Sequence, residues 1–311
     1  MTASVRRLMA ITSVAVLCLV AAGCSRGGAA ETVAVTPTLV AAPSPTASTA
    51  PQEPTVTLKV MSFNVLYGAG HERRFDQHVG NRFKGRDRMP ELMTFMRGAD
   101  PDVLAVEEAA GWDAGEPSVA AQIAEELGMS YVLAPDAWEL HIVLFSKYPI
   151  IEADYVSRFQ DFNGVALRAT IAVAEDVAVN VLAVHLNSMS RDTRACQVEA
   201  LFDMARAMPG RTILLGDMNF RSNSPQADVL RRGGWQLVAV QPGWPIDQIW
   251  LDDSGGFATG GWWSALPPPE GISDHLPVGA EMTFGVTPSP EPFDGEAVGD
   301  PGELIYACPL S

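Results

Sequence analysis

The segment TILLGDMN, residues 212–219, is an apolar run that ends on an Asp-x-Asn pair. Such a run is typical of a buried strand, and Gly216 lets a ligand or another backbone approach closely. Asp217 can bind a cation or accept a proton, and the amide of Asn219 can donate to a phosphate oxygen. Because Gly, Asp and Asn are also common in turns, this segment alone predicts either a site or a plain turn after a strand.

The rest of the chain alternates strand and helix patterns. Expected strands occupy residues 58–64, 103–106, 142–146, 166–174, 178–184, 212–215, 246–250 and 278–284, and expected helices occupy residues 90–96, 118–127, 193–208 and 225–231. The short connection at residues 175–177 predicts an antiparallel hairpin. The sequence has no dinucleotide-binding glycine pattern and no P-loop, so we expect a mixed sheet arrangement with helices outside.

Polar residues gather at the ends of these strands, as they do after 212–215. They are Asn64, Glu107, Glu108, His185, Asn187, Asp247, Asp274 and His275. A single polar residue after a strand is commonly a solvated loop residue. Its repetition in strand after strand predicts that one end of the sheet arrangement carries a functional site.

Seven motifs follow one another between residues 60 and 284: FNVLYG, DVLAVEE, SKYPI, HLNS with RACQ, LLGDMN, IDQIW and SDHLPV. In the order and spacing of these motifs, the chain resembles the endonuclease/exonuclease/phosphatase, or DNase I-like, superfamily. The resemblance implies an α/β fold of four layers, in which two mixed, mostly antiparallel β-sheets pack face to face with helices outside. It also implies a phosphoric ester hydrolase that depends on Mg²⁺, with Mn²⁺ or Ca²⁺ as alternative ions.

The resemblance assigns roles to the acids and amides at the strand ends. Glu108 would be the main metal ligand, with Asn64 and Asp274 in or near the same shell. Asp217 would orient or deprotonate the attacking water, and Asn219 would bind the scissile phosphate.

The resemblance also assigns roles to the histidines. His275, paired with Asp247, would act as a general acid or base, or as a donor to the phosphoryl oxygens. His185 would contact the phosphate or protonate the leaving group, and Asn187 is a weaker candidate for substrate binding.

Two features depart from the superfamily's pattern. Glu107 stands where Gln is usual, and three hypotheses are open: it raises the pKa of its neighbour, it recruits a second cation, or it turns toward a basic side chain such as Arg168. A long basic stretch lies between Asn64 and the next helix, and this stretch includes Arg88. It is either a solvated loop or an anion-facing one. In the second case Arg82 and Arg86 would bind the substrate.

The first residues predict export. Two Arg precede a short apolar stretch, residues 8–20, which ends in Ala-Ala-Gly-Cys. We expect a lipoprotein signal peptide over residues 1–23 and lipidation at Cys24, with an ordinary secretory signal as the alternative. A disordered Pro/Thr/Ser/Ala-rich linker over 24–55, the catalytic domain over 56–285 and an acidic Pro-rich tail over 286–311 would follow. Cys196 and Cys308 would then be either a disulfide or two free thiols in an oxidising compartment.

The charge of the chain limits its partners. The formal net charge is −16, and loss of the two signal-peptide Arg makes it −18. Such acidity argues against tight, sequence-independent binding of duplex DNA. We expect a monomer, anchored outside the cytoplasm, that hydrolyses nucleic acid or a small or lipid phosphoester. Nuclease-like activity ranks ahead of sphingomyelinase-like or inositol-phosphate phosphatase-like activity, and a non-catalytic surface lipoprotein is the hypothesis from another class.

Overall fold

The computed structural model describes residues 54–156, 165–208, 210–252, 256–262, 271–286 and 301–303, with only the backbone for 258–262 and 303. The predicted signal peptide, nearly all of the linker and most of the tail lie outside the described residues, and so do Cys24 and Cys308. Among the described helices none is long and apolar enough to span a bilayer.

Two β-sheets form the centre of the domain. The first sheet has the strand order β11 (Phe257–Trp262), β12 (Val278–Gly285), β1 (Thr55–Asn64), β2 (Val103–Glu107), β4 (Ile142–Ser146) and β3 (Ser130–Ala134). The second has the order β13 (Gly302–Glu303), β5 (Ile150–Val156), β6 (Val165–Ala174), β7 (Val177–His185), β8 (Thr212–Asp217), β10 (Asp247–Asp252) and β9 (Trp235–Val240). Most neighbouring strands are antiparallel, and β1–β2, β7–β8 and β13–β5 are the parallel pairs of the described residues.

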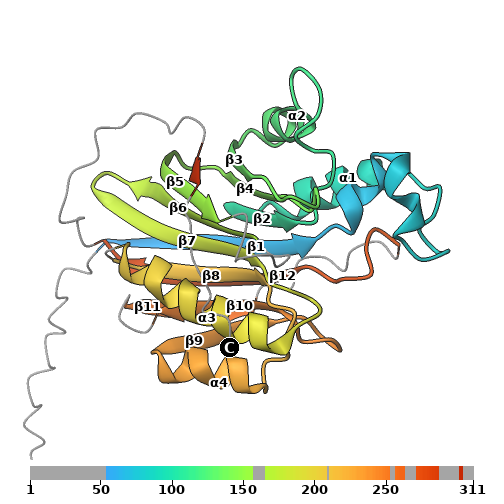
Figure 1. The fold of residues 1–311 in the computed structure, drawn as a ribbon. Helices are drawn as coiled ribbons and strands as arrows, with labels where there is room; N and C mark the ends of the chain where they lie inside the picture. The colour runs from blue at the N-terminus through green and yellow to red at the C-terminus, as the bar shows by residue number, and fades with distance from the viewer. Residues whose placement is uncertain are drawn as a thin grey trace, which may run out of the picture. The chain divides into compact units, whose positions relative to one another are not determined.

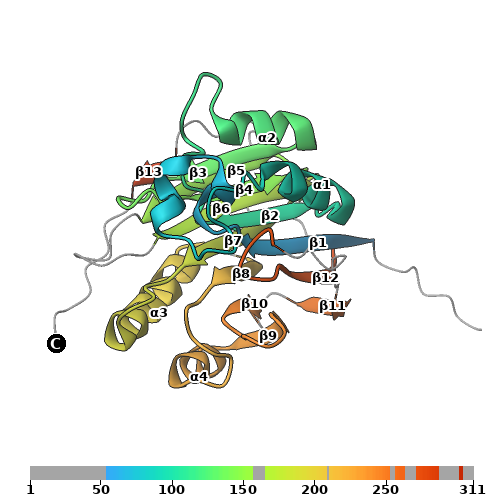
Figure 2. The same ribbon diagram turned by 90° about the vertical axis from the view of Figure 1, so that its right-hand side faces the viewer.

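Helices cover both outer faces of the sheets. Helices α1 (Met89–Ala99) and α2 (Val119–Leu127) lie on the first sheet, and α3 (Arg191–Arg206) and α4 (Pro225–Arg232) lie on the second (Figures 1 and 2). The side chains of Ser118, Ser190 and Ser224 cap α2, α3 and α4 by accepting a backbone N–H of the first turn. The four-layer α/β sandwich implied by the sequence is confirmed.

The strand pattern explains why the core is continuous. In β8 the side chains of Ile213 and Leu215 pack between the two sheets, while Leu214 points to the layer under α3 and α4. In β1, Val60 and Met61 divide in the same way between the inter-sheet layer and the layer under α1 and α2. Because successive strand residues point to opposite faces, a strand buried on both faces must be an unbroken apolar run.

The pairing of the strands brings their polar ends together. In the parallel pairs, Asn64 of β1 stands opposite Glu107 of β2, and His185 of β7 stands opposite Asp217 of β8. Strand β10 runs antiparallel to β8, so its first residue, Asp247, also stands opposite Asp217. These residues therefore share the end of the sandwich toward which β1 points, on the right in Figure 1 and toward the viewer in Figure 2.

The expected strands and helices all occur, within a few residues of their predicted bounds, and the predicted hairpin is the antiparallel pair β6–β7. Strands β3, β5, β9, β11 and β13 have no counterpart among the expected strands. Strands β3, β9, β11 and β13 are the edge strands of the two sheets, and in β3 and β9 burial is partial and the apolar pattern is weak.

The C-terminal tail contacts the domain at β13, which pairs with β5 through Gly302 and Glu303. Cys196 of α3 is disulfide-bonded. Because Cys308 lies outside the described residues, the pairing of these two cysteines stays a prediction.

Candidate active site

Asp217 lies at the centre of the site and is 2% exposed. Its Oδ2 atom lies 3.2 Å from Asn64 Nδ2. Two imidazole nitrogens approach the same oxygen, His185 Nε2 at 3.7 Å and His275 Nε2 at 3.9 Å. The other oxygen accepts the backbone N–H of Asn219 at 2.8 Å. Three nitrogens from separate segments therefore face one carboxylate oxygen.

The glycine before Asp217 is required by the sheet. Gly216 has a φ of 141°, and a Cβ at this position would lie 2.0 Å from the carbonyl oxygen of Val184. Any larger residue would push β8 away from β7 and displace the carboxylate of Asp217.

Glu108 is held by two donors. Its Oε1 accepts from Asn64 Nδ2 and its Oε2 accepts from the backbone N–H of Tyr67, each at 3.1 Å. Because the Oδ1 of Asn64 accepts from the N–H of Leu66, Asn64 presents its donor group to the acids. In this geometry Asn64 orients Glu108 and Asp217, and its predicted role as a metal ligand stays a prediction.

A strained segment follows β1 and positions Glu108. Five successive residues, 66–70, have positive φ values between 49° and 74°. Such backbone is costly for residues other than glycine and is found where the surrounding structure enforces it. Here it turns the N–H of Tyr67 toward Glu108, and Gly68 packs so closely that a Cβ would lie 2.1 Å from the carbonyl oxygen of Ala110.

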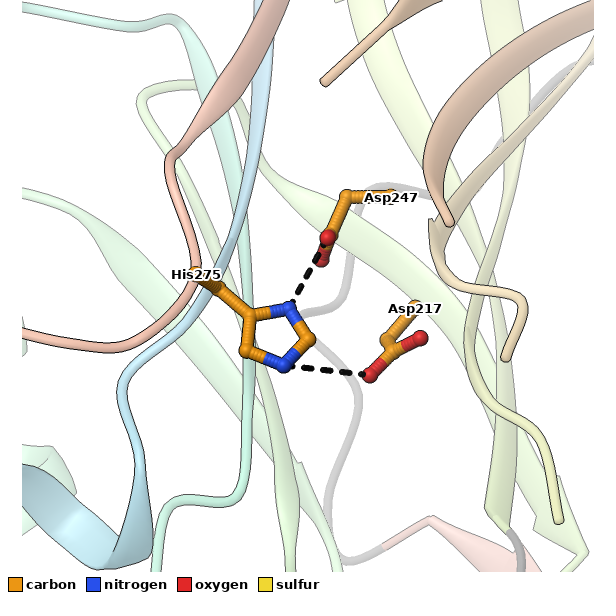
Figure 3. A group of neighbouring side chains, drawn as sticks. All are labelled: Asp217, Asp247 and His275. Atoms are coloured by element: carbon orange, nitrogen blue, oxygen red, sulfur yellow. Dashed lines mark hydrogen bonds and ion pairs between the residues drawn. The ribbon is translucent and has the colours of Figure 1, made fainter. Parts of the chain in front are cut away.

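His275 and Asp247 form a buried hydrogen-bonded pair, in which His275 Nδ1 lies 2.9 Å from Asp247 Oδ2 (Figure 3). Burial raises the pKa of Asp247, and the charge of Asp217 raises it further. Burial also disfavours a charged His275, but the hydrogen bond and charge of Asp247 and the charge of Asp217 outweigh it and raise the pKa of His275 to about 10. The imidazole is therefore a cation at neutral pH, and its Nε2 points toward Asp217.

Glu107 is fully buried behind this pair. Its Oε1 accepts from the hydroxyl of Ser62 at 2.9 Å, and its Oε2 has no partner among the described residues. Burial, followed by the charge of Asp247, raises the pKa of Glu107 well above its ordinary value. Arg168 instead contacts Asp154 in the neighbouring strand, at 2.9 Å from its Nε. The hypothesis that Glu107 turns toward Arg168 is therefore wrong.

His185 and Asn219 line the same centre. His185 Nε2 lies 3.9 Å from Glu108 Oε1, so this imidazole is placed between Glu108 and Asp217. Asn219 uses one Nδ2 hydrogen to bond the carbonyl oxygen of Leu186 at 2.9 Å. A carboxamide nitrogen carries two hydrogens, and the second can donate to a phosphate oxygen.

Asn187 has a structural role next to this centre. Its Oδ1 accepts the backbone N–H groups of Met189 and Ser190, at 2.9 and 2.6 Å, and so shapes the turn before α3. The predicted substrate contact of Asn187 stays a prediction.

The loop before β12 is fixed to the end of β1 by Ser273. Its hydroxyl donates to the carbonyl oxygen of Asn64 at 2.7 Å and accepts the N–H of His275 at 3.1 Å. Asp274 between them is exposed. Burial raises the pKa of Tyr67, and the charges of Glu108 and Asp274 raise it further. The carboxylates of Glu108 and Asp274 are therefore both close enough to the phenol of Tyr67 to influence its pKa.

The basic segment borders this loop. Arg86 lies beside it, because a Cβ on Gly271 would be 2.8 Å from the Nη1 of Arg86. Arg82 is exposed and packs on the ring of Phe83, with its guanidinium carbon 5.3 Å from the ring centroid. Arg88 is fully buried, so neither the solvated nor the anion-facing interpretation of the segment holds for Arg88.

The site has an excess of acids that fits a hard divalent cation. Five acids gather at this end of the sheets, namely Glu107, Glu108, Asp217, Asp247 and Asp274. Among the described residues, the cations whose charge reaches these acids include His275, Arg88 and Arg194. Carboxylate oxygens are the ligands that Mg²⁺ prefers, and one or two suffice because the ion keeps several waters. Glu108 and Asp274 would hold such an ion at the exposed side of the cluster.

A second group of possible ligand atoms lies deeper, where Asp217, Asp247 and His275 offer atoms within 4.8 Å of one another (Figure 3). We interpret this group as a proton network. Asp247 is 0% exposed and already bonds Nδ1 of His275, and a protonated imidazole has no lone pair for a metal.

Several residues of the site are not among the predicted ones. Ser62, Tyr67 and Ser273 act through hydroxyl or backbone groups, which leave no pattern at strand ends. Gln241, in the orientation that satisfies its neighbours, donates to Asp247 and accepts from the N–H of Leu276 at 2.8 Å. Gln241 thus helps to fix the position of the Asp247–His275 pair.

A sequence profile of the Endonuclease/Exonuclease/phosphatase family matches residues 61–275. No curated protein matches the chain in sequence. An endonuclease/exonuclease/phosphatase family protein from Bacteroides thetaiotaomicron is 16% identical with a TM-score of 0.59, and the match covers 76% of this chain and 98% of that one.

Two further solved structures share the fold. The human Nocturnin catalytic domain with a bound sulfate anion is 15% identical with a TM-score of 0.58, covering 74% of this chain and 97% of that one. ANGEL2, described as a 2′,3′-cyclic phosphatase, is 14% identical with a TM-score of 0.58, covering 74% and 96%. At these identities the likeness concerns the fold.

Proposed function

The chain belongs to the endonuclease/exonuclease/phosphatase family, and we propose that it is a Mg²⁺-dependent phosphoesterase that cleaves a phosphodiester bond by in-line attack of water. The arrangement around Asp217 is the observation that carries this proposal. One carboxylate oxygen faces three nitrogens, and Glu108 lies beside it through the shared donor Asn64. A phosphoester hydrolase needs this combination of acid, donors and cation site.

The metal, when bound, supplies positive charge that offsets the charge of the phosphoryl oxygens. Asp217 is fixed by Asn64 and Asn219, so its free lone pairs can orient a water and take its proton as the water attacks phosphorus. Proton transfer from the water leaves Asp217 neutral and frees the imidazolium of His275 to act on the phosphate.

His275 and His185 then act on the substrate oxygens that gain negative charge. The imidazolium of His275, held by Asp247, donates from Nε2 to a phosphoryl oxygen where negative charge grows. His185, when protonated, gives its proton to the leaving oxygen, and the remaining hydrogen of Asn219 Nδ2 holds another phosphoryl oxygen.

A nucleic acid or nucleotide is the substrate class that we rank first. The basic segment lies next to the loop of His275, where Arg86 lies beside Gly271 and Arg82 is exposed. These two side chains would bind the phosphates that flank the scissile bond. The acidity of the whole chain limits such binding to this local stretch.

A lipid phosphodiester is the second candidate, and exposed apolar side chains favour it. Five large apolar side chains are exposed in the described residues, and four of them occupy loops at the site's end of the sheets. They are Trp138 and Trp244, each 63% exposed, Met189 at 85% and Leu276 at 42%. Trp and aliphatic side chains around a phosphate site suit contact with a membrane interface. Attachment of the exported domain by a lipid at Cys24 would place it at such a surface.

The test is an assay of the purified full chain against plasmid DNA, RNA, sphingomyelin vesicles and inositol phosphates, with Mg²⁺ or Mn²⁺ and with a chelator. We expect metal-dependent hydrolysis of at least one substrate. Hydrolysis of none would contradict the proposal and favour a non-catalytic binding lipoprotein.

Matched variants separate the two substrate classes. The double variant Trp138→Ser with Trp244→Ser should hydrolyse the lipid of vesicles more slowly than the wild type if lipid is the substrate. Tyr131→Ser, at an exposed apolar residue away from the site, is the control. Unchanged hydrolysis of the vesicle lipid in the double variant would exclude membrane contact by these two side chains, and no hydrolysis of that lipid by the wild type would exclude the lipid candidate.

A further inference from the structure

Arg88 is a fully buried cation beside the site. It is 0% exposed and stands directly before α1. Its guanidinium lies over the ring of Phe83, with 5.2 Å between the guanidinium carbon and the ring centroid. A buried arginine normally contacts a carboxylate, but in the part of the chain that the structure describes no acid forms an ion pair with this one.

The guanidinium instead donates to backbone carbonyls of two loops. Its Nη2 donates to the oxygen of Leu66 at 2.6 Å, and its Nη1 donates to the oxygens of Val65, at 3.3 Å, and Ile272. Leu66 begins the strained segment after β1 and Val65 directly precedes it, while Ile272 belongs to the loop before β12. One side chain therefore connects two segments that are about 200 residues apart in sequence.

Each of these loops presents one predicted metal ligand. The strained segment gives the N–H of Tyr67 to Glu108. The loop of Ile272 carries Asp274 two residues later. Burial lowers the pKa of Arg88, whereas the charges of Asp274 and Glu108 raise it, so these acids lie within electrostatic reach of the guanidinium.

We propose that Arg88 is a positioning residue of the metal site, which sets the separation between Glu108 and Asp274 by holding their loops together through backbone carbonyls. This inference rests on the proposed function, because it assumes that these two acids bind the metal. A planar fork with several fixed donors can reach both loops at once, whereas a lysine offers a single nitrogen. Outer groups that orient ligands commonly change metal affinity about 10–100-fold when replaced.

The experiment measures Mn²⁺ binding to the full chain by electron paramagnetic resonance, together with the Mg²⁺ dependence of kcat. The variants are Arg88→Met, which keeps the length of the side chain without donors, and Arg88→Lys, which keeps the charge. Arg97→Met is the control, because Arg97 lies at the other end of α1, 48% of its side chain is exposed and it contacts Glu126. Urea unfolding of each protein gives the folded fraction.

We expect the dissociation constant for Mn²⁺ to rise about tenfold or more in Arg88→Met, less in Arg88→Lys, and not at all in Arg97→Met. A role in stability alone would lower the unfolding midpoint but leave the affinity of the folded protein unchanged, and that result would overturn the proposal. Loss of folding in both Arg88 variants would also overturn it, because Arg88 would then be a residue of the core. If the wild-type chain binds no Mn²⁺, the proposed function itself fails.

Discussion

Replacing Glu107 by Gln is expected to stabilise the domain at neutral pH and to leave its stability unchanged near pH 4. Glu107 is 0% exposed, its carboxyl group bonds only the hydroxyl of Ser62 among the described residues, and it lies near the charges of Asp247 and Asp217. Its carboxyl group therefore keeps its proton to higher pH in the folded protein than in the unfolded chain, where it ionises above its ordinary pKa of 4.5. Gln has nearly the same shape and does not titrate.

The magnitude follows from the protonation that folding requires. Because the folded pKa of Glu107 is raised, its contribution to stability is complete below pH 4.5 and is lost as the pH rises toward the folded pKa. Each pH unit between 4.5 and the raised pKa of the folded group costs about 1.4 kcal/mol. Glu107→Gln removes this cost.

Urea unfolding followed by tryptophan fluorescence, with a chelator present and at pH values from 4 to 8, measures the difference. The free energies of unfolding of wild type and Glu107→Gln should coincide near pH 4 and diverge as the pH rises, with the variant more stable. Glu199→Gln, at an exposed position of α3, is the control and should give a constant difference. Parallel pH profiles for wild type and Glu107→Gln, or a less stable variant at pH 7, would refute a raised pKa for the buried carboxyl group of Glu107.

Three further changes test other parts of the site. Asp247→Asn should lower kcat about 10²–10⁴-fold and lower the pKa of His275 measured by NMR, since the imidazolium loses its charged partner; an unchanged pKa would contradict the pairing. Gly216→Ala should lower the free energy of unfolding by about 1–3 kcal/mol, because its Cβ would meet a carbonyl of β7, and urea unfolding measures this. Arg82→Glu with Arg86→Glu should raise KM for a nucleic acid substrate and leave kcat nearly unchanged; an unaltered KM would count against a substrate-binding role.

The parts of the fold that sequence predicts best are those buried on both faces. The runs that became β1, β2, β7 and β8 are continuous and apolar because each strand lies between another sheet and a helix layer. Their polar ends, such as Asp217 and His185, are therefore visible in the sequence as abrupt changes from apolar to polar residues. Edge strands such as β9 are half-exposed and give no comparable signal.

The residues that hold the site in place are less visible. Arg88 lies among other basic residues of a loop, and nothing in the sequence separates a buried guanidinium from its solvated neighbours. Gln241 contacts Asp247 only because β10 begins beside the end of β9. The partner of Glu107 is Ser62 in the adjacent strand, whereas charge alone suggested Arg168, which faces Asp154. Such contacts depend on strand register, and a sequence pattern does not give register across sheets.

The most direct test of the central claim is hydrolysis of bis(p-nitrophenyl) phosphate, a soluble phosphodiester that needs no specific substrate-binding loop. Release of p-nitrophenol is measured for wild type and Asp217→Asn, each with Mg²⁺ or Mn²⁺ and with excess chelator, after urea unfolding has shown that both proteins are folded. We expect turnover by wild type with metal, its loss with chelator and recovery on adding metal back. We also expect a decrease of several orders of magnitude in Asp217→Asn. Turnover that is equal in the two folded proteins, or that persists in chelator, would contradict the assignment of this cluster as a metal-dependent phosphoesterase site.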